Sequence, residues 1–175
     1  MRAAVVPLLI VLGLGLAACE RRAPAPAREP EAPRPSPEWE RVRALREAAA
    51  AVPTALDVRP LAEPGIADRL AEAERLEAEG RHDEAQALLE QARARDPGSP
   101  EVLQHLAENA LLRGDAGSAE RLALEAERLG PGLGSLCLRH WLLIAEARHR
   151  LGRPEEALAA RERAARCAVA RPPRF

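Results

Sequence analysis

Hydrophobic residues recur at helical spacing over most of the chain, and three segments break this pattern. An uncharged apolar run covers residues 5–17, and a proline-rich polar stretch follows it. Residues 38–52 then repeat apolar side chains at helical intervals until Pro53 ends the pattern. Three prolines interrupt the next dozen residues, and helical spacing resumes from Ile66 to about Ala168. The pattern predicts an all-α domain behind a single helix, a spacer and an apolar leader.

The apolar leader follows a positive start and ends in the sequence Leu16-Ala17-Ala18-Cys19. The run is shorter than the roughly 20 residues that a membrane-spanning helix needs, as is typical of a secretory signal peptide. Small residues before a Cys resemble the lipobox of bacterial lipoproteins. The resemblance implies that residues 1–18 are removed and that Cys19 carries lipid as the new N-terminus. An ordinary signal peptide with a chance Cys is the alternative.

The residue after Cys19 bears on location. It is Glu20, whereas Asp at this place favours retention in the inner membrane among lipoproteins. The resemblance therefore implies an outer-membrane lipoprotein facing the periplasm. Residues 19–37 form the lipidated Cys and a proline-rich linker, which at roughly 3.1 Å per residue spans on the order of 50 Å. A ligand for an aromatic groove is the second interpretation of this proline-rich run.

Three short stretches in the helical region carry the same turn between two helices, with Gly at the helix C-terminus and an Ala-rich segment after it. Five positions repeat after 34 residues: Ala73, Gly80, Ala85, Ala92 and Pro97 return as Ala107, Gly114, Ala119, Ala126 and Pro131. Four of them return again after 38 residues as Ala145, Gly152, Ala157 and Ala164. An insertion within residues 132–137 accounts for the difference of four. Small residues at these places indicate that paired helices approach closely.

A period of 34 residues, with these small residues in register, resembles the tetratricopeptide repeat family. The resemblance covers residues 66–169, as hairpins at 66–99, 100–133 and 138–169, and implies a short helical solenoid. Only the third copy has an aromatic at the family's Trp position, Trp141, and that copy ends in Val169 where the others have Pro. Residues 38–65 supply an N-terminal helix and a connection. We expect this helix to cap one end of the stack, with Trp39 as a packing anchor rather than a ligand site.

In this family the first helix of each hairpin lines a concave groove. Register places Glu74, Glu108 and Glu146 at one equivalent position, as an acidic ladder. The resemblance implies a partner-binding groove made by Glu74, Glu77, Gln104, Glu108, Leu111, Arg139, Leu142, Glu146 and His149. An acidic ladder favours a basic protein or peptide partner. Solvated helix surface, chosen for helix propensity, is the alternative for these Glu residues.

Two cysteines remain after Cys19, in a compartment that is oxidising. Cys137 precedes the first helix of the third hairpin, and Cys167 lies near the end of its second helix. These two ends are neighbours in an antiparallel hairpin, so we expect a disulfide. Two buried thiols, packed as small apolar groups, are the alternative.

Charge is unevenly spread along a chain whose net charge is −1. Residues 66–160 hold 12 Arg against 18 Asp and Glu, and residues 161–175 hold five Arg against one Glu. The basic tail, residues 170–175, either binds anionic envelope components or is a solvated end. The chain as a whole lacks the strong positive field expected of a nucleic-acid-binding protein.

Motifs of catalysis are not found in the sequence: it has no Gly-rich phosphate loop, no nucleophile elbow and no H-E-x-x-H zinc motif. The four His residues show no i, i+4 pair. We therefore expect no enzyme activity, no metal, no cofactor, no small-molecule substrate and no nucleic-acid partner. The leading interpretation is a membrane-anchored scaffold for proteins of the cell envelope. A self-associating structural lipoprotein and a non-catalytic accessory subunit of an envelope enzyme are the alternatives.

Overall fold

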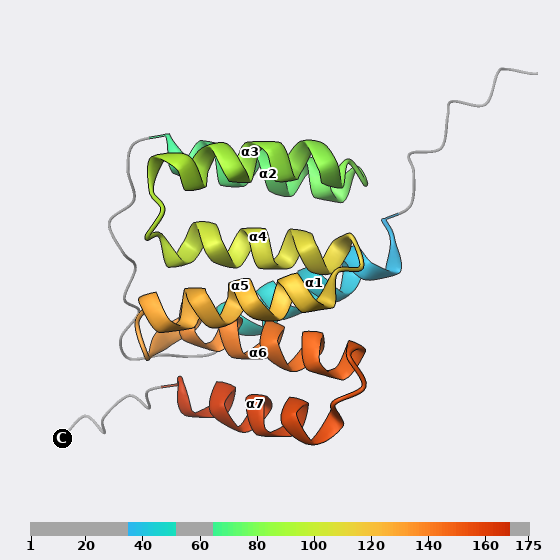
Figure 1. Cartoon of the computed structure of the whole chain (residues 1–175), viewed down its shortest axis with the longest axis vertical. Coiled ribbons are helices and arrows are strands. Elements are labelled where there is room, and N and C mark those ends of the chain that lie inside the picture. Colours follow the sequence, from blue (N-terminus) through green and yellow to red (C-terminus); the bar gives the residue numbers. More distant parts are fainter. Residues whose placement is uncertain (1–34, 52–64, 169–175) are drawn as a thin grey trace, which may run out of the picture. The chain divides into compact units, whose positions relative to one another are not determined.

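The computed structural model of the chain describes residues 35–51 and 65–168, all within one compact unit (Figure 1). The signal peptide, Cys19, nearly all of the linker, the connection at 52–64 and the basic tail lie outside these residues. The described part is entirely helical, with helices α1 (Pro37–Ala51), α2 (Ile66–Ala78), α3 (His82–Arg95), α4 (Pro100–Leu112), α5 (Ala116–Leu129), α6 (Gly134–Arg150) and α7 (Pro154–Arg166). None of these helices combines the length and apolar character that crossing a membrane requires.

Helices α2 to α7 form three consecutive hairpins, so the predicted all-α solenoid is confirmed. Each hairpin turns at a glycine with positive φ, which is 77° at Gly80, 82° at Gly114 and 73° at Gly152. In the first turn the N–H of Gly80 donates to Glu77, and the N–H of Arg81 donates to Leu76, at 3.0 and 2.8 Å. This is the Schellman pattern, which satisfies the last carbonyls of a helix and needs a left-handed residue. The second and third turns repeat both bonds.

Alanines fill the places where the helices of the stack approach one another. The repeated positions are almost completely buried, at 3% exposure or less: Ala73, Ala107, Ala145, Ala85, Ala119, Ala157, Ala92, Ala126 and Ala164. Larger side chains, such as Leu89, Leu103 and Ile144, fill the space between them. A methyl group is thus the largest side chain that the close contacts hold, because protein interiors are tightly packed.

The third hairpin begins earlier than the sequence predicted. Its first helix, α6, starts at Gly134 rather than at residue 138, and has 17 residues where α2 and α4 have 13. Four residues are close to one turn of 3.6, so the insertion lengthens the helix and keeps its faces in register. Cys137 consequently lies inside the first turn of α6 and not before it.

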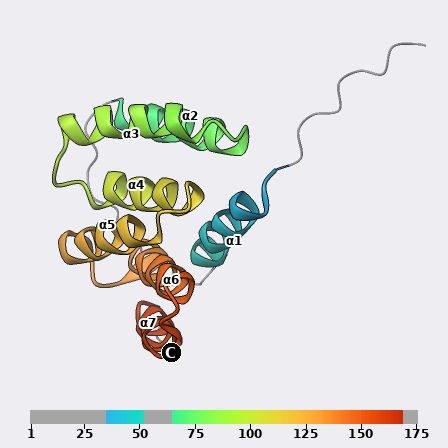
Figure 2. The ribbon, with the colours of Figure 1, turned by 45° about the vertical axis from the view of Figure 1, so that its right-hand side comes forward.

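We expected helix α1 to cap one end of the stack, and this expectation was wrong. It contacts α4 and α6, and its Arg46 reaches Glu77 on α2. Figure 2 shows α1 crossing beside α4 and α6, on the side away from α3 and α5. We call the surface formed by α2, α4 and α6 the inner face. The predicted groove surface is therefore covered, over part of its length, by a helix of the same chain.

Candidate functional site

Arg46 is the centre of the contact between α1 and the inner face. It lies on the same stripe of α1 as Val42 and Ala49, which are fully buried, and only 13% of its own side chain is exposed. Its Nε donates to Glu108 at 2.8 Å, and one Nη donates to Glu77 at 2.8 Å. The second Nη lies 3.6 Å from Glu74. A single guanidinium thus faces three carboxylates from two helices.

Glu108 accepts hydrogen bonds at both carboxylate oxygens, from three helices. Arg139 of α6 donates through two nitrogens at 2.5 and 2.6 Å, Gln104 of α4 donates at 2.8 Å, and Arg46 completes the set. Burial alone would raise the pKa of Glu108, but Arg139 and Arg46 outweigh it and hold that pKa far below its ordinary value. Glu108 is therefore ionised inside the fold, as a buried carboxylate can be only when it is paired.

Glu77 is the second buried carboxylate of the cluster. It accepts from Arg46 and, at 3.1 Å, from the side-chain amide of Asn109 on α4. Burial raises the pKa of Glu77, and the Arg46 contacts oppose this shift without cancelling it. Burial also lowers the pKa of Arg46, but Glu108, Glu77 and Glu74 outweigh it, so that pKa is above its ordinary value. Arg46 stays charged and holds the two carboxylates together.

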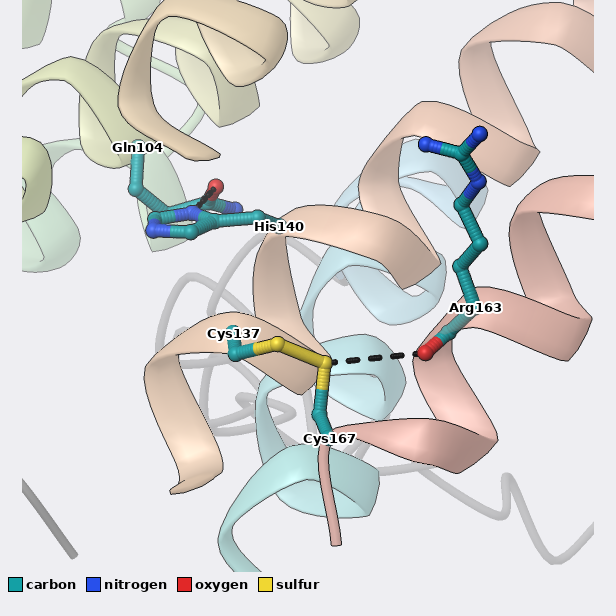
Figure 3. The surroundings of a disulfide bond; sticks show 5 residues. All are labelled: Gln104, Cys137, His140, Arg163 and Cys167. Carbon is teal, nitrogen blue, oxygen red and sulfur yellow. Dashed lines mark hydrogen bonds between the residues drawn. A yellow bond between two sulfur atoms is a disulfide. The ribbon is translucent and has the colours of Figure 1, made fainter. Parts of the chain in front are cut away.

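Two buried histidines extend this polar cluster into the stack. Gln104 donates through its nitrogen to Glu108, so its oxygen accepts from Nδ1 of His140, 2.6 Å away (Figure 3). Burial, with Arg139 nearby, lowers the pKa of His140 to about 3 and that of His105 well below 6.5. Nε2 of His140 has no hydrogen-bond partner, and a Cβ on Gly130 would lie 3.0 Å from it. Both rings are thus neutral and packed as core residues.

The structure brings some of the predicted groove residues together and separates others. Glu74, Glu77, Gln104, Glu108 and Arg139 meet around Arg46. Glu146 does not join them, because it pairs with Arg150 one turn along α6 at 3.0 Å. Only Glu74 and Glu108 of the predicted acidic ladder therefore lie in the cluster. Of the remaining three residues, Leu111 is fully buried, Leu142 is half-buried and His149 is exposed.

The two cysteines of the third hairpin lie side by side and form a disulfide in the structure, with Cα atoms 5.7 Å apart (Figure 3). Both side chains are buried, and Sγ of Cys167 lies 3.7 Å from the carbonyl oxygen of Arg163. The N–H of Gly134 donates to the carbonyl of Cys167 at 2.9 Å. The open end of the hairpin is therefore closed by a backbone hydrogen bond beside the sulfur atoms.

Arg46, Asn109, His105 and His140 are members of the cluster that the groove prediction did not name. Arg46 could have been predicted from the sequence, because it places a charge between Val42 and Ala49 on the apolar stripe of its helix. A charge in such a place indicates a buried partner of opposite sign. Asn109 and the two histidines gave no comparable signal, since their places depend on how the hairpins stack.

The arrangement binds a helix of the same chain through a charged cluster. Its carboxylates are all engaged with arginines, and the inner face already holds one amphipathic helix through a guanidinium. Across residues 35–51 and 65–168, no group of three or more His, Cys, Asp or Glu side chains is arranged to hold a metal ion.

Comparison with known proteins agrees with this fold. Residues 76–132 match the tetratricopeptide repeat family. Among solved structures, the chain is similar to the globular C-terminal domain of P. aeruginosa LpoP, with 32% sequence identity and a TM-score of 0.57. This similarity covers 60% of the present chain and 99% of the LpoP domain. A search of curated proteins found no significant match.

Proposed function

Because the repeat region of this chain belongs to the tetratricopeptide repeat family, we propose that the protein is a membrane-anchored scaffold that binds other proteins of the cell envelope. The observation that carries the proposal is the inner face, where Glu77 and Glu108 hold a helix through its buried arginine, Arg46. A surface that binds one such helix inside the chain has the chemistry to bind another from a partner. The scaffold assembles or regulates an envelope complex and is not itself an enzyme.

The proposed location is the outer membrane, facing the periplasm. The apolar leader ending at Cys19, and Glu20 after it, support this placement. The similarity to LpoP adds support, since the matching part of LpoP is described as a globular C-terminal domain, and here too the repeats follow a long N-terminal region. The proline-rich linker then separates the repeats from the lipid.

Site-specific crosslinking in intact cells tests this function. A photo-crosslinking residue replaces His149, which is exposed on α6 at the position equivalent to Glu77 and Leu111. The matched control replaces Leu158, which is 58% exposed on α7. We expect one foreign protein to crosslink at residue 149 and not at residue 158. Exclusive crosslinks to a second copy would support the self-associating lipoprotein instead, and turnover of a substrate by the purified protein would contradict the non-catalytic role.

A further inference from the structure

Helix α1 is held on the inner face by Arg46 and by a narrow apolar stripe, in which Trp39 and Leu45 are only partly buried. Only Val42 and Ala49 of its 15 residues are buried, whereas α4 buries 11 of 13 and α6 nine of 17. Arg43, another arginine of α1, pairs with Glu40 and Glu47 of the same helix and not with the inner face. The free energy of this contact therefore depends mainly on one guanidinium and a short apolar stripe.

The receiving side of the contact is organised by groups other than α1. Arg139 and Gln104 orient Glu108, and Asn109 orients Glu77. These donors all belong to α4 and α6, so the two carboxylates keep their directions when α1 leaves. Removal of α1 exposes a preorganised pair of carboxylates next to the buried apolar surface that Val42 and Ala49 now cover.

The geometry favours arginine over lysine as the side chain that binds there. Arg46 uses Nε for Glu108 and Nη for Glu77, so the planar fork spans carboxylates from two different helices. A lysine ammonium is a compact charge without this fork. The stripe around Arg46 sets the rest of the pattern, with Val42 four residues before it, Leu45 one before and Ala49 three after.

We infer that the inner face is a receptor for an amphipathic helix of a partner protein, carrying one arginine within an apolar stripe, and that α1 occupies it as an internal competitor. This inference rests on the proposed function and names its partner class. Because α1 is covalently tethered, it competes at a high effective concentration, and a partner binds only by displacing it. Binding and release of α1 are then two outcomes of one equilibrium.

A labelled peptide with the sequence of residues 35–52 is the probe. It is titrated by fluorescence anisotropy against the full mature chain in three forms: unchanged, Arg46→Ala and Arg43→Ala. Arg46→Ala removes the guanidinium that pairs with Glu77 and Glu108, whereas Arg43→Ala makes the same change of charge on the exposed side of the same helix. We expect the Arg46→Ala chain to bind the peptide at least about tenfold more tightly than the other two.

Peptide variants test the chemistry of the receptor. The peptide with Arg46→Glu should not bind, and the peptide with Arg46→Lys should bind at least about fivefold more weakly than the unchanged one. Equal affinity of all three chain forms, or equal affinity of the Arg and Glu peptides, would overturn the inference. A dimer of the unchanged chain that Arg46→Ala dissociates would overturn it too, because α1 of a second copy would then be the occupant.

Hydrogen exchange is measured on the unchanged chain, so this test does not require any variant to fold. Amides of α1 should exchange faster than those of α4, and excess peptide should raise the α1 rate further while leaving α4 unchanged. No response of α1 to the peptide would contradict displacement. If crosslinking at residue 149 still captures a foreign protein in that case, the proposed function stands and only the inference fails.

Discussion

Glu108 shows how a single residue determines the character of the inner face. It is a fully buried carboxylate that accepts four hydrogen bonds. One comes from Arg46, one from Gln104, and two from Nε and one Nη of Arg139. Such a group contributes little net free energy while all partners are present, because desolvation offsets much of the attraction. Its loss, however, leaves two arginines facing each other with reduced compensation.

Glu108→Gln keeps the shape of the side chain and removes the charge. We expect it to lower the free energy of unfolding by about 3 kcal/mol, because it leaves buried arginines under-compensated. The matched control is Glu74→Gln, whose side chain is 41% exposed and for which we expect about 1 kcal/mol or less. Urea denaturation followed by circular dichroism measures both. Equal losses would mean that the buried cluster contributes no more than a surface ion pair.

Stability should fall in mild acid because of the two buried histidines. Their pKa values in the folded protein lie below the ordinary 6.5, at about 3 for His140. Between these values the unfolded chain binds more protons than the folded one, so the free energy of unfolding decreases as pH falls. Each histidine contributes up to about 1.4 kcal/mol per pH unit. The lowered pKa of Glu108 adds to the loss below about pH 4.5, whereas the raised pKa of Glu77 opposes the loss above about that pH.

Urea denaturation at pH 7.5 and pH 5.5 measures this dependence. His140→Asn keeps a donor for Gln104 and removes the titrating ring, so its loss between the two pH values should be smaller than that of the unchanged chain by about 1 kcal/mol. Identical pH dependence in the two proteins would show that His140 is not held neutral in the fold.

At the scale of helices, the sequence predicted the repeating hairpins but not the place of α1. Gly80, Gly114 and Gly152 fix the turns through backbone conformation, which is a local property and therefore visible in the sequence. The docking of α1 depends on groups 31 and 62 residues away from Arg46. Periodicity identifies the apolar stripe of a helix but does not identify the surface that it covers. The same reason explains why Glu146 was placed in the ladder, although its nearest cation is on its own helix.

The third hairpin carries a covalent constraint between its two helices. The disulfide of Cys137 and Cys167 closes a segment with a sequence separation of 30. A loop of this length is expected to contribute about 3–4 kcal/mol. We predict that the mature protein, denatured without reductant, has no free thiol, and that Cys137→Ser with Cys167→Ser lowers its stability by about that amount. Two thiols per chain in a colorimetric count would refute the bridge.

At the scale of the whole molecule, the proposed attachment to the membrane would determine where the inner face operates. We predict that Cys19 is the N-terminus of the mature protein and carries lipid, and that Cys19→Ala either releases the protein from the membrane fraction or stalls its processing. Mass spectrometry of the native N-terminal peptide measures this directly. An unmodified Cys19, or cleavage at another bond, would contradict the prediction. Glu20→Asp is the companion variant, expected to shift the protein from the outer to the inner membrane fraction.

The position of α1 in the chain gives its docking a mechanical consequence. It lies between the proposed lipid attachment and the repeats, so a pulling force between membrane and bound partner passes through it. Its 15 residues span about 1.5 Å each as a helix and about 3.3 Å each when stretched. Detachment and unwinding of α1 would therefore lengthen the tether by about 27 Å. At the proposed location, Arg46 would thus also limit how far the repeats extend from the membrane.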